Sequence, residues 1–471
     1  MYLHWCLAAA RRVSDTVQND LTCQRLGVGE GIEIHSSVRK PTFIDVFAGC
    51  GGLSLGLKRA GWRGLLAIER DKFAFDTLSS NFSGGREGLT YDWPEGIERR
   101  AWDISELLRI RQKELSQLAG SVDLLAGGPP CQGFSHAGRR RPDDPRNQLF
   151  EAYLELVSIV RPKAVLIENV RGFTSSFDRR EHGGIVNFAH TLQERLQRDY
   201  DTISAVVKAS DLGVPQSRPR FFLAGVLKDQ GLAESLKGFF DSLYEYSSPF
   251  LKMRGLPKKV TARDAISDLE VGHNGAVQCF ECPGFEAIDY KAPRSAYQIA
   301  MRDGFEGKPS DTRLARHRPE IVERFASIIR SSREEGRLNV SISPETRRAH
   351  GLKKMAIRVM DPLSPAPTIT SLPDDLLHYS EPRTLTVREN ARLQSFPDWF
   401  SFKGKYTTGG NLRTKEVPRF TQVANAVPPL VAEQIGLCLA RLLTGDLSYT
   451  SLQGNTNLRK SRLLVAQLAT K

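Results

Sequence analysis

The chain has 471 residues, of which 40% are hydrophobic and 25% charged, with a net charge of +12 and a pI near 9.4. This length accommodates two or three domains, and the positive charge favours a polyanionic partner, most often nucleic acid. Seven cysteines scattered along such a chain argue against a disulfide framework and for the reducing cytoplasm. We find no apolar run of the roughly 20 residues that a membrane helix needs.

Short apolar strands alternate with amphipathic helices from Pro41 to about Leu227, after a first segment, 1–40, without assignable chemistry. The expected strands are 42–47, 64–68, 122–126, 164–167, 201–207 and 220–226. This alternation predicts an α/β fold with a doubly wound, mostly parallel sheet. Ligands of such sheets bind beyond the carboxyl ends of the strands.

The alternation fades after Asp229, and an irregular stretch rich in Pro, Gly and charge follows, which predicts a second, smaller domain. Its segment 308–358 holds 13 Lys/Arg and 6 Asp/Glu, so its charge is 13 − 6 = +7, typical of either a solvated surface or a nucleic-acid face. Helices resume at 386–396 and 427–443. The predicted parts are an extension (1–40), a first catalytic part (41–258), the second domain (259–384), a closing catalytic part (385–445) and a loose tail (446–471).

A glycine-rich turn follows the first strand, in the segment Phe-Ile-Asp-Val-Phe-Ala-Gly-Cys-Gly-Gly-Leu at 43–53. Glycines let a ligand approach the backbone, and Glu69, at the end of the next strand, can accept hydrogen bonds from two ribose hydroxyls. The spacing fits neither the dinucleotide nor the phosphate-loop pattern, so an adenosyl ligand without a phosphate chain fits better. Asp103 can bond an adenine amino group or simply cap the helix that starts at Ile104.

A cysteine stands on the loop after the third strand, in Pro129-Pro130-Cys131-Gln132. A thiol in this setting is well placed to meet a substrate, although most cysteines are structural. Glu168 ends the following strand, and a thiol beside a carboxyl suits attack on a ring that is protonated as it is attacked. Arg218 and Arg220 can stabilise a thiolate or hold a base or phosphate; the alternative is a surface position.

Other polar groups give weaker signals. Arg139, Arg140 and Arg141 follow the cysteine loop and can clamp phosphate or remain solvated. Cys279 and Cys282 have a metal-like spacing but lack a second Cys/His pair nearby, so we predict no metal site. His136 and His378 have no identifiable role as a base.

Taken together, these segments strongly resemble the DNA (cytosine-5) methyltransferase family of the prokaryotic restriction-modification type. The resemblance covers about 41–228 and 384–445, with motifs in the family's order. The matching segments are 43–53, Glu69, Asp103-Ile104, 128–135, 168–170, 216–220, 388–397 and 422–429. Ala424 stands where the family usually has glycine.

The resemblance implies an adenosylmethionine-dependent, Rossmann-like catalytic domain, a target-recognition domain at 259–384, and S-adenosyl-L-methionine as methyl donor without a metal. The catalytic residues it implies are Cys131, Glu168, Arg218 and Arg220. The cofactor-binding residues it implies are Asp45, Phe47, Ala48, Gly49, Gly51, Gly52, Leu53, Glu69, Asp103, Ile104, Pro129, Asn425 and Val427.

The implied reaction is methylation of carbon 5 of a flipped-out cytosine in a specific double-stranded DNA sequence, through a covalent Cys131 adduct. The implied setting is a cytoplasmic, nucleoid-associated monomer, with a cognate restriction endonuclease acting on the same sequence. Three alternatives stay open: a tRNA cytosine-5 methyltransferase, an amino-group methyltransferase, and a DNA-binding regulator with a retired active site. The Pro-Pro-Cys sequence argues against the second, and the presence of all catalytic positions argues against the third.

Overall fold

The computed structural model describes residues 39–129, 145–174, 177–179, 184–186, 188–408, 412 and 415–445. The chain divides into two units, Met1–Arg39 and Lys40–Lys471, and the fold below is that of the second. Nearly all of the predicted extension, the loop that carries Cys131, and the C-terminal tail therefore lie outside the described residues.

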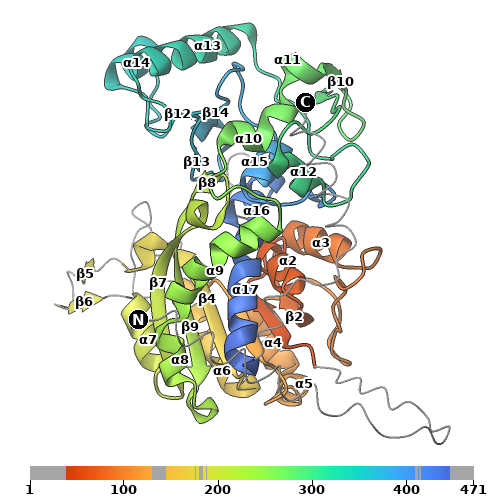
Figure 1. The fold of residues 1–471 in the computed structure, drawn as a ribbon, viewed down its shortest axis with the longest axis vertical. Helices are drawn as coiled ribbons and strands as arrows, with labels where there is room; N and C mark the ends of the chain where they lie inside the picture. The colour runs from red at the N-terminus through yellow and green to blue at the C-terminus, as the bar shows by residue number, and fades with distance from the viewer. Residues whose placement is uncertain are drawn as a thin grey trace, which may run out of the picture. The chain divides into compact units, whose positions relative to one another are not determined.

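A six-stranded sheet forms the centre of this unit, in the order β2-β1-β3-β4-β9-β7 (Figure 1). Its strands are β1 (Thr42–Val46), β2 (Arg63–Ile68), β3 (Leu124–Gly127), β4 (Ala164–Val170), β7 (Tyr200–Lys208) and β9 (Pro219–Leu227). The first four strands pair in parallel, whereas β9 runs antiparallel to both β4 and β7. All six predicted strands are present, and the sheet is mostly parallel as predicted, with β9 reversed.

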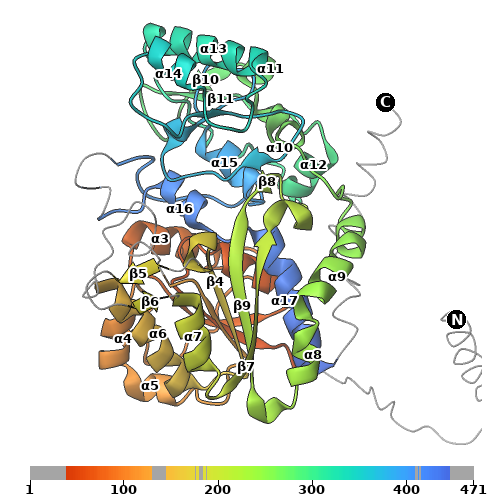
Figure 2. The ribbon, with the colours of Figure 1, turned by 90° about the vertical axis from the view of Figure 1, so that its left-hand side faces the viewer.

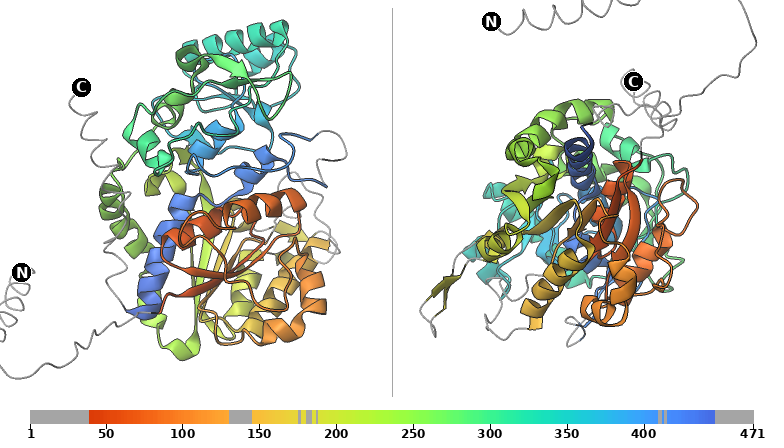
Figure 3. Two further views of the ribbon diagram at one scale, coloured as in Figure 1. Left: turned by 90° about the vertical axis from the view of Figure 1, so that its right-hand side faces the viewer. Right: turned by 90° about the horizontal axis from the view of Figure 1, so that it is seen from below.

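Helices cover both faces of the sheet, as a doubly wound fold requires (Figure 2). Successive residues of β1 enter different cores, since Phe43 packs in one cluster and Ile44 in the other. Burial on both faces explains why these strands are continuous apolar runs. On the first face lie α2 (Gly52–Arg59), α8 (Ala233–Lys237), α9 (Phe239–Met253) and α17 (Pro429–Thr444), and on the second α4 (Ile104–Ile110), α5 (Gln112–Ser116), α6 (Pro145–Val160) and α7 (Phe188–Leu196) (Figure 3).

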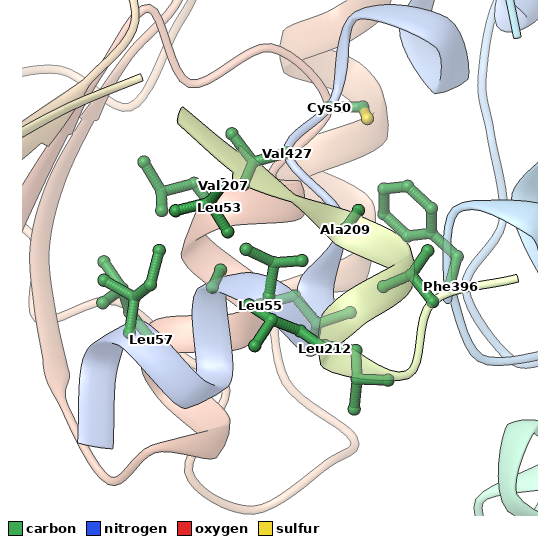
Figure 4. Close-up of a cluster of buried hydrophobic side chains, with 14 of the residues drawn as sticks. Cys50, Leu53, Leu55, Leu57, Val207, Ala209, Leu212, Phe396 and Val427 are labelled. Carbon is green, nitrogen blue, oxygen red and sulfur yellow. The ribbon is translucent and has the colours of Figure 1, made fainter. Parts of the chain in front are cut away.

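The chain returns to the first face at its end. Leu53, Leu55 and Leu57 of the α2 segment gather with Val207 and Val427 in this core (Figure 4). One helical stretch among the described residues, Arg419–Thr444, passes a test of length and apolarity for a membrane helix, but 72% of its apolar part is buried inside the protein. This stretch therefore reads as a core helix.

The segment between α9 and α15 (Val387–Leu393) forms mostly short helices and strands of two or three residues. They are α10 (Ala262–Ile266), α11 (Val271–Asn274), β10 (Ala276–Gln278), β11 (Glu286–Ile288), α12 (Ala296–Arg302), α13 (Pro319–Glu334), α14 (Pro344–Ala349), β12 (Arg358–Val359), β13 (Ala366–Pro367) and β14 (Leu376–Leu377). β13 pairs in parallel with β8 (Gln216–Ser217), so this segment is hydrogen-bonded to the strand that precedes Arg218.

α13 is more regular than the irregular stretch predicted here. Its Phe325, Ile328 and Ile329 form a small core with Val359 and Leu377. These apolar residues recur at helical spacing, a periodicity that indicates an amphipathic helix from the sequence alone. Both helices predicted after this domain are present, since α15 spans most of 386–396 and α17 most of 427–443.

Candidate active site

Residues predicted to act together converge at one end of the sheet, where the carboxyl ends of the parallel strands lie, and this end is called the edge of the sheet below. The parallel strands β1, β2, β3 and β4 end there, and the loops that follow them start there. Because β9 runs the opposite way, its first residues reach the same edge, where Arg220 pairs in register with Val170. The reversed strand thus brings Arg218 and Arg220 to Glu168.

The turn after β1 presents backbone rather than side chains. Phe47, Gly49 and Gly51 all have positive φ, at 59°, 55° and 94°, a conformation that favours glycine. A Cβ on Gly51 would lie 2.6 Å from the Phe82 ring, while no described atom lies within 4 Å of a Cβ placed on Gly49. The turn is therefore packed behind Gly51 and open at Gly49, a cradle that an adenosyl group fits.

Glu69 is tied to this cradle. Its Oε2 accepts the Gly49 N–H at 2.9 Å, and its Oε1 accepts the Asp71 N–H at 2.7 Å. Each carboxylate oxygen has a second lone pair, so the two ribose hydroxyls still find acceptors. Burial raises the pKa of Glu69, which the two backbone N–H groups oppose.

Asp103 caps α4, the simpler of its two predicted roles. Its Oδ1 accepts the backbone N–H groups of Ser105 at 2.9 Å and Glu106 at 3.4 Å. The Trp102 N–H donates to the Glu69 carbonyl at 2.8 Å, which places Asp103 beside the cradle. Ile104, the first residue of α4, is 2% exposed and packs in the core, so its predicted cofactor contact stays a prediction.

Two residues predicted to bind cofactor, Asp45 and Leu53, are buried in the core beside the turn. Asp45 is 1% exposed. Asp45 Oδ2 accepts the Ser54 hydroxyl, which lies 2.6 Å from the Tyr91 hydroxyl, and burial raises the pKa of Asp45 to about 7. Because β1 is buried on both faces, the Asp45 carboxyl joins strand to helix across the turn; its contact with the cofactor stays a prediction.

Glu168 is paired at the edge of the sheet. Its Oε1 lies 3.1 Å from Arg220 Nε, and both side chains are nearly buried. Burial raises the pKa of Glu168, while Arg220 and Arg218 oppose the shift. Arg218 is 1% exposed, and its Nε and Nη1 have no hydrogen-bond partner among the described residues. Unused donors on a buried guanidinium indicate a place for an acceptor from outside the chain.

The cysteine loop starts beside Glu168. Asn169 Nδ2 donates to the Pro129 carbonyl at 3.0 Å, and a Cβ on Gly128 would lie 2.9 Å from the Glu168 carbonyl oxygen. Cys131 itself lies outside the described residues, as do His136 and Arg139–Arg141. The sequence predicted no role for Asn169. A polar residue directly after Glu168, at the end of an apolar strand, was the feature that could have indicated one.

The last motif closes the cradle from the other side. A Cβ on Gly52 would lie 2.4 Å from the Val427 carbonyl oxygen, and Asn425 is exposed at the end of α16 (Arg419–Asn425). Ala424 lies within α16, where alanine is the best helix former, so its departure from glycine carries no backbone penalty.

The remaining histidine and cysteine candidates are buried or partly buried in the fold. His378 is buried, and its Nδ1 accepts the Ser380 and Glu381 N–H groups. Cys279 is buried and Cys282 partly buried, both as free thiols. Within the described ranges, no cluster of three or more His, Cys, Asp or Glu residues is arranged to hold a metal ion.

A mostly parallel sheet with a glycine cradle and an acidic residue after β2 fits the class of adenosylmethionine-dependent methyltransferases. The family model described as C-5 cytosine-specific DNA methylase matches residues 41–440, and the chain belongs to this family. It is accordingly a DNA (cytosine-5)-methyltransferase that uses S-adenosyl-L-methionine and acts on DNA.

Relatives span most of the chain. Type II methyltransferase M.DdeI of Desulfomicrobium norvegicum is 33% identical over 410 residues, which cover 83% of this chain and 86% of the relative. Type II methyltransferase M.XorII of Xanthomonas oryzae pv. oryzae is 30% identical, with 84% of each chain covered. A prophage-encoded E. coli protein described as a DNA modification methyltransferase is similar in structure, with a TM-score of 0.56, 27% identity and coverage of 86% of this chain and 99% of its own.

Proposed function

We propose that the enzyme methylates a cytosine flipped out of double-stranded DNA, within one short sequence, through a covalent bond from Cys131 to carbon 6. The observation that carries the proposal is the Glu168 carboxyl, held beside Arg220 where the Pro129 loop begins. A desolvated carboxyl beside a cysteine-bearing loop supplies the acid that attack on the ring requires.

The Cys131 thiolate adds to carbon 6 of the base. The electrons of the 5,6 double bond form a double bond between carbons 4 and 5, the electrons of the double bond between carbon 4 and nitrogen 3 move onto that nitrogen, and nitrogen 3 takes a proton from Glu168. S-adenosylmethionine, when bound, supplies the methyl group that the enamine-like carbon 5 accepts. Loss of the carbon 5 hydrogen as a proton, with expulsion of the thiolate, restores the ring and returns the nitrogen 3 proton to Glu168.

Glu168 must carry a proton to act in this way. Burial, the larger influence, raises its pKa and favours the protonated form, whereas Arg220 at 3.1 Å opposes it. Entry of the base into the pocket removes further water from the carboxyl. We assign the free donors of Arg218 to the carbonyl oxygen of the base or to a flanking phosphate.

The cofactor is proposed to lie on the open side of the glycine turn. Glu69 would accept the ribose hydroxyls and Asp103 the adenine amino group, with Ile104 contributing its backbone. The remaining contacts are assigned to Phe47, Ala48, Gly49, Gly51, Gly52, Pro129, Asn425 and Val427. Open space at Gly49 and the spare lone pairs of Glu69 support this assignment.

The cellular role is proposed from the relatives. Type II methyltransferases accompany restriction systems, so the enzyme is proposed to protect nucleoid DNA in the cytoplasm from an endonuclease that cuts the same sequence. It is proposed to act as a monomer, because one recognition part and one catalytic part can hold the duplex between them.

Bisulfite sequencing tests the activity and the target together. DNA from a methylation-free host expressing the enzyme should show protected cytosines in one short recognition sequence, called the word below. DNA from a host expressing the Cys131→Ala variant should show no such protection. Cys282→Ala is the matched control, because it removes a partly buried free thiol from the β10–β11 turn, and it should protect the same word.

Protection by Cys131→Ala would refute the covalent role of that thiol. If the soluble wild-type enzyme protects no DNA word, the proposed DNA target is refuted, and bisulfite sequencing of the host's tRNA then tests the RNA alternative.

A further inference from the structure

Two buried glutamines join three parts of the molecule. Gln216 and Gln394 are both 0% exposed, and Gln216 Nε2 donates to Gln394 Oε1 at 3.0 Å. They lie 178 residues apart in sequence, one before β9 and the other after α15. Neither touches Glu168 or the glycine turn directly, and the reaction as described above uses neither.

Gln216 is hydrogen-bonded to the predicted target-recognition domain (259–384), called the recognition segment below. Its Oε1 accepts the Ile369 N–H at 3.1 Å, next to the ladder between β8 and β13. Thr368 Oγ1 donates to the Ser217 carbonyl at 2.8 Å and strengthens the same joint. Arg218 follows directly in the chain, so the position of β13 is coupled to the backbone that carries this arginine.

Gln394 reaches the cofactor side. Its Nε2 donates to the Val423 carbonyl at 2.8 Å and to the Ala426 carbonyl at 3.1 Å. Ala426 stands between Asn425 and Val427, in the turn whose Val427 oxygen closes against Gly52. Gln394 thereby fixes the turn that packs on the cradle.

Both amides are fully used. Each side-chain oxygen accepts one N–H, and each side-chain nitrogen donates twice, the second Gln216 bond going to the Leu393 carbonyl at 3.1 Å. The partners fix which amide atom is nitrogen and which is oxygen. A displacement of β13 therefore either breaks one of these hydrogen bonds or moves Gln216, Gln394 and the 423–426 backbone with it, because both glutamines are buried and water cannot replace a lost bond.

We infer that the Gln216–Gln394 pair is a positioning device that couples the seating of target DNA on the recognition segment to the cofactor-side turn. It rests on the proposed function, in which Arg218 holds the base and Asn425–Val427 contact the cofactor. Coupling of this kind is reciprocal: DNA bound in register tightens cofactor binding, and cofactor tightens binding of the correct DNA.

Cofactor affinity measured with two duplexes tests the inference. S-adenosylhomocysteine, which has no methyl group to transfer, is titrated calorimetrically into the enzyme with a duplex carrying the word found by bisulfite sequencing, and with the same duplex scrambled at that word. The wild-type enzyme should bind it at least about fivefold more tightly with the first duplex, the lower end of typical coupling. Gln394→Met should bring the ratio close to one.

Gln434→Met is the matched control. Gln434 is also 0% exposed, and its Nε2 donates to the Leu212 and Leu430 carbonyls at 2.9 and 3.0 Å, which are not members of the Gln216–Gln394 set of hydrogen bonds. It should lose stability comparably and keep the wild-type ratio. If Gln394→Met does not fold, Gln216→Met replaces it, because it removes the donor to Gln394 without burying a charge.

A wild-type ratio of one, or a wild-type ratio retained by the Gln394 or Gln216 variant, would overturn the coupling. Methylation of the word by the wild-type enzyme, measured on the same preparation, separates that failure from a failure of the proposed function. A ratio lost equally in Gln434→Met would also overturn it, because general loosening would then suffice.

Discussion

Two arginines of this enzyme are equally buried and differ in their partners. Arg392 of α15 bonds Asp398 through Nε and Nη2, at 2.5 and 2.7 Å, and Asp268 through Nη2 at 3.2 Å. Arg218 has no described partner for Nε or Nη1. Burial lowers the pKa of both; at Arg392 the two carboxylates outweigh it and raise the pKa, while that of Arg218 stays low.

The difference separates scaffold from site. A buried cation whose donors are all used holds elements of the chain together, and one with unused donors is kept for a ligand. Replacing the first should therefore cost stability, and replacing the second should cost activity.

Arg392→Met gives the largest expected effect. It leaves the Asp268 carboxyl buried without its cation and Asp398 with Arg302 as its remaining ion-pair partner, which costs about 3–5 kcal/mol in the free energy of unfolding. Urea denaturation followed by fluorescence measures the loss. The control is Arg348→Met, which removes an exposed pair with Glu345 and should cost at most about 1 kcal/mol. Equal losses in the two variants would contradict the scaffold reading.

Glu168→Gln should lower the single-turnover methylation rate by on the order of 10²-fold or more, because the amide cannot give a proton to ring nitrogen 3. Its stability should change little, since it also relieves the cost of a buried carboxyl. Quenched-flow measurement of methyl transfer to labelled DNA checks the rate. An unchanged rate would remove Glu168 from the mechanism.

The same carboxyl sets a pH dependence. The pKa of Glu168 is raised by burial, so the protonated form persists to higher pH, and the rate of methyl transfer should fall as pH rises through that pKa. The Glu168→Gln variant should lack this alkaline decline. Single-turnover rates across the pH range in which both enzymes stay folded decide the point, and parallel profiles would contradict it.

Arg218→Met should show the reverse of Arg392→Met. Loss of a charged hydrogen bond to the base or phosphate costs about 1.5–3 kcal/mol, roughly a 10- to 100-fold drop in kcat/KM for DNA. The urea midpoint should stay the same or rise, because a buried cation whose Nε and Nη1 have no hydrogen-bond partner among the described residues is replaced by an apolar chain of similar length. A drop in the midpoint as large as that of Arg392→Met would break the comparison.

The sequence was sufficient for the strands and for the edge where they end, because apolar runs and turn residues are local signals. The direction of β9 was not predicted, because it depends on the connection between β7 and β9. The 209–218 segment is too short for the crossover that parallel strands need, so β9 runs antiparallel to β7. The same limit hid which arginine pairs with Glu168. Arg218 and Arg220 read alike in sequence, and only the β4–β9 register separates the paired one from the unpaired one.

Asp45 lies between the two kinds of site, and its effect depends on pH. Its Oδ2 is bonded to Ser54, while its Oδ1 has no hydrogen-bond partner among the described residues. Burial raises its pKa from 3.8 to about 7, so between these values the folded chain holds a proton that the unfolded chain releases. The free energy of unfolding should fall as pH rises, by about 1.4 kcal/mol per pH unit from this group alone.

The Asp45→Asn variant isolates that contribution. Asparagine keeps an acceptor for the Ser54 hydroxyl and cannot ionise, so its stability relative to wild type should increase steadily from pH 5 to 7. Asp76→Asn, at an exposed pair with Lys72, is the control and should give a flat difference over the same range. A flat difference for Asp45→Asn as well would mean that the second carboxylate oxygen is solvated or bonded, and the distinction between used and unused buried polar atoms would then fail as a guide to the sites of this enzyme.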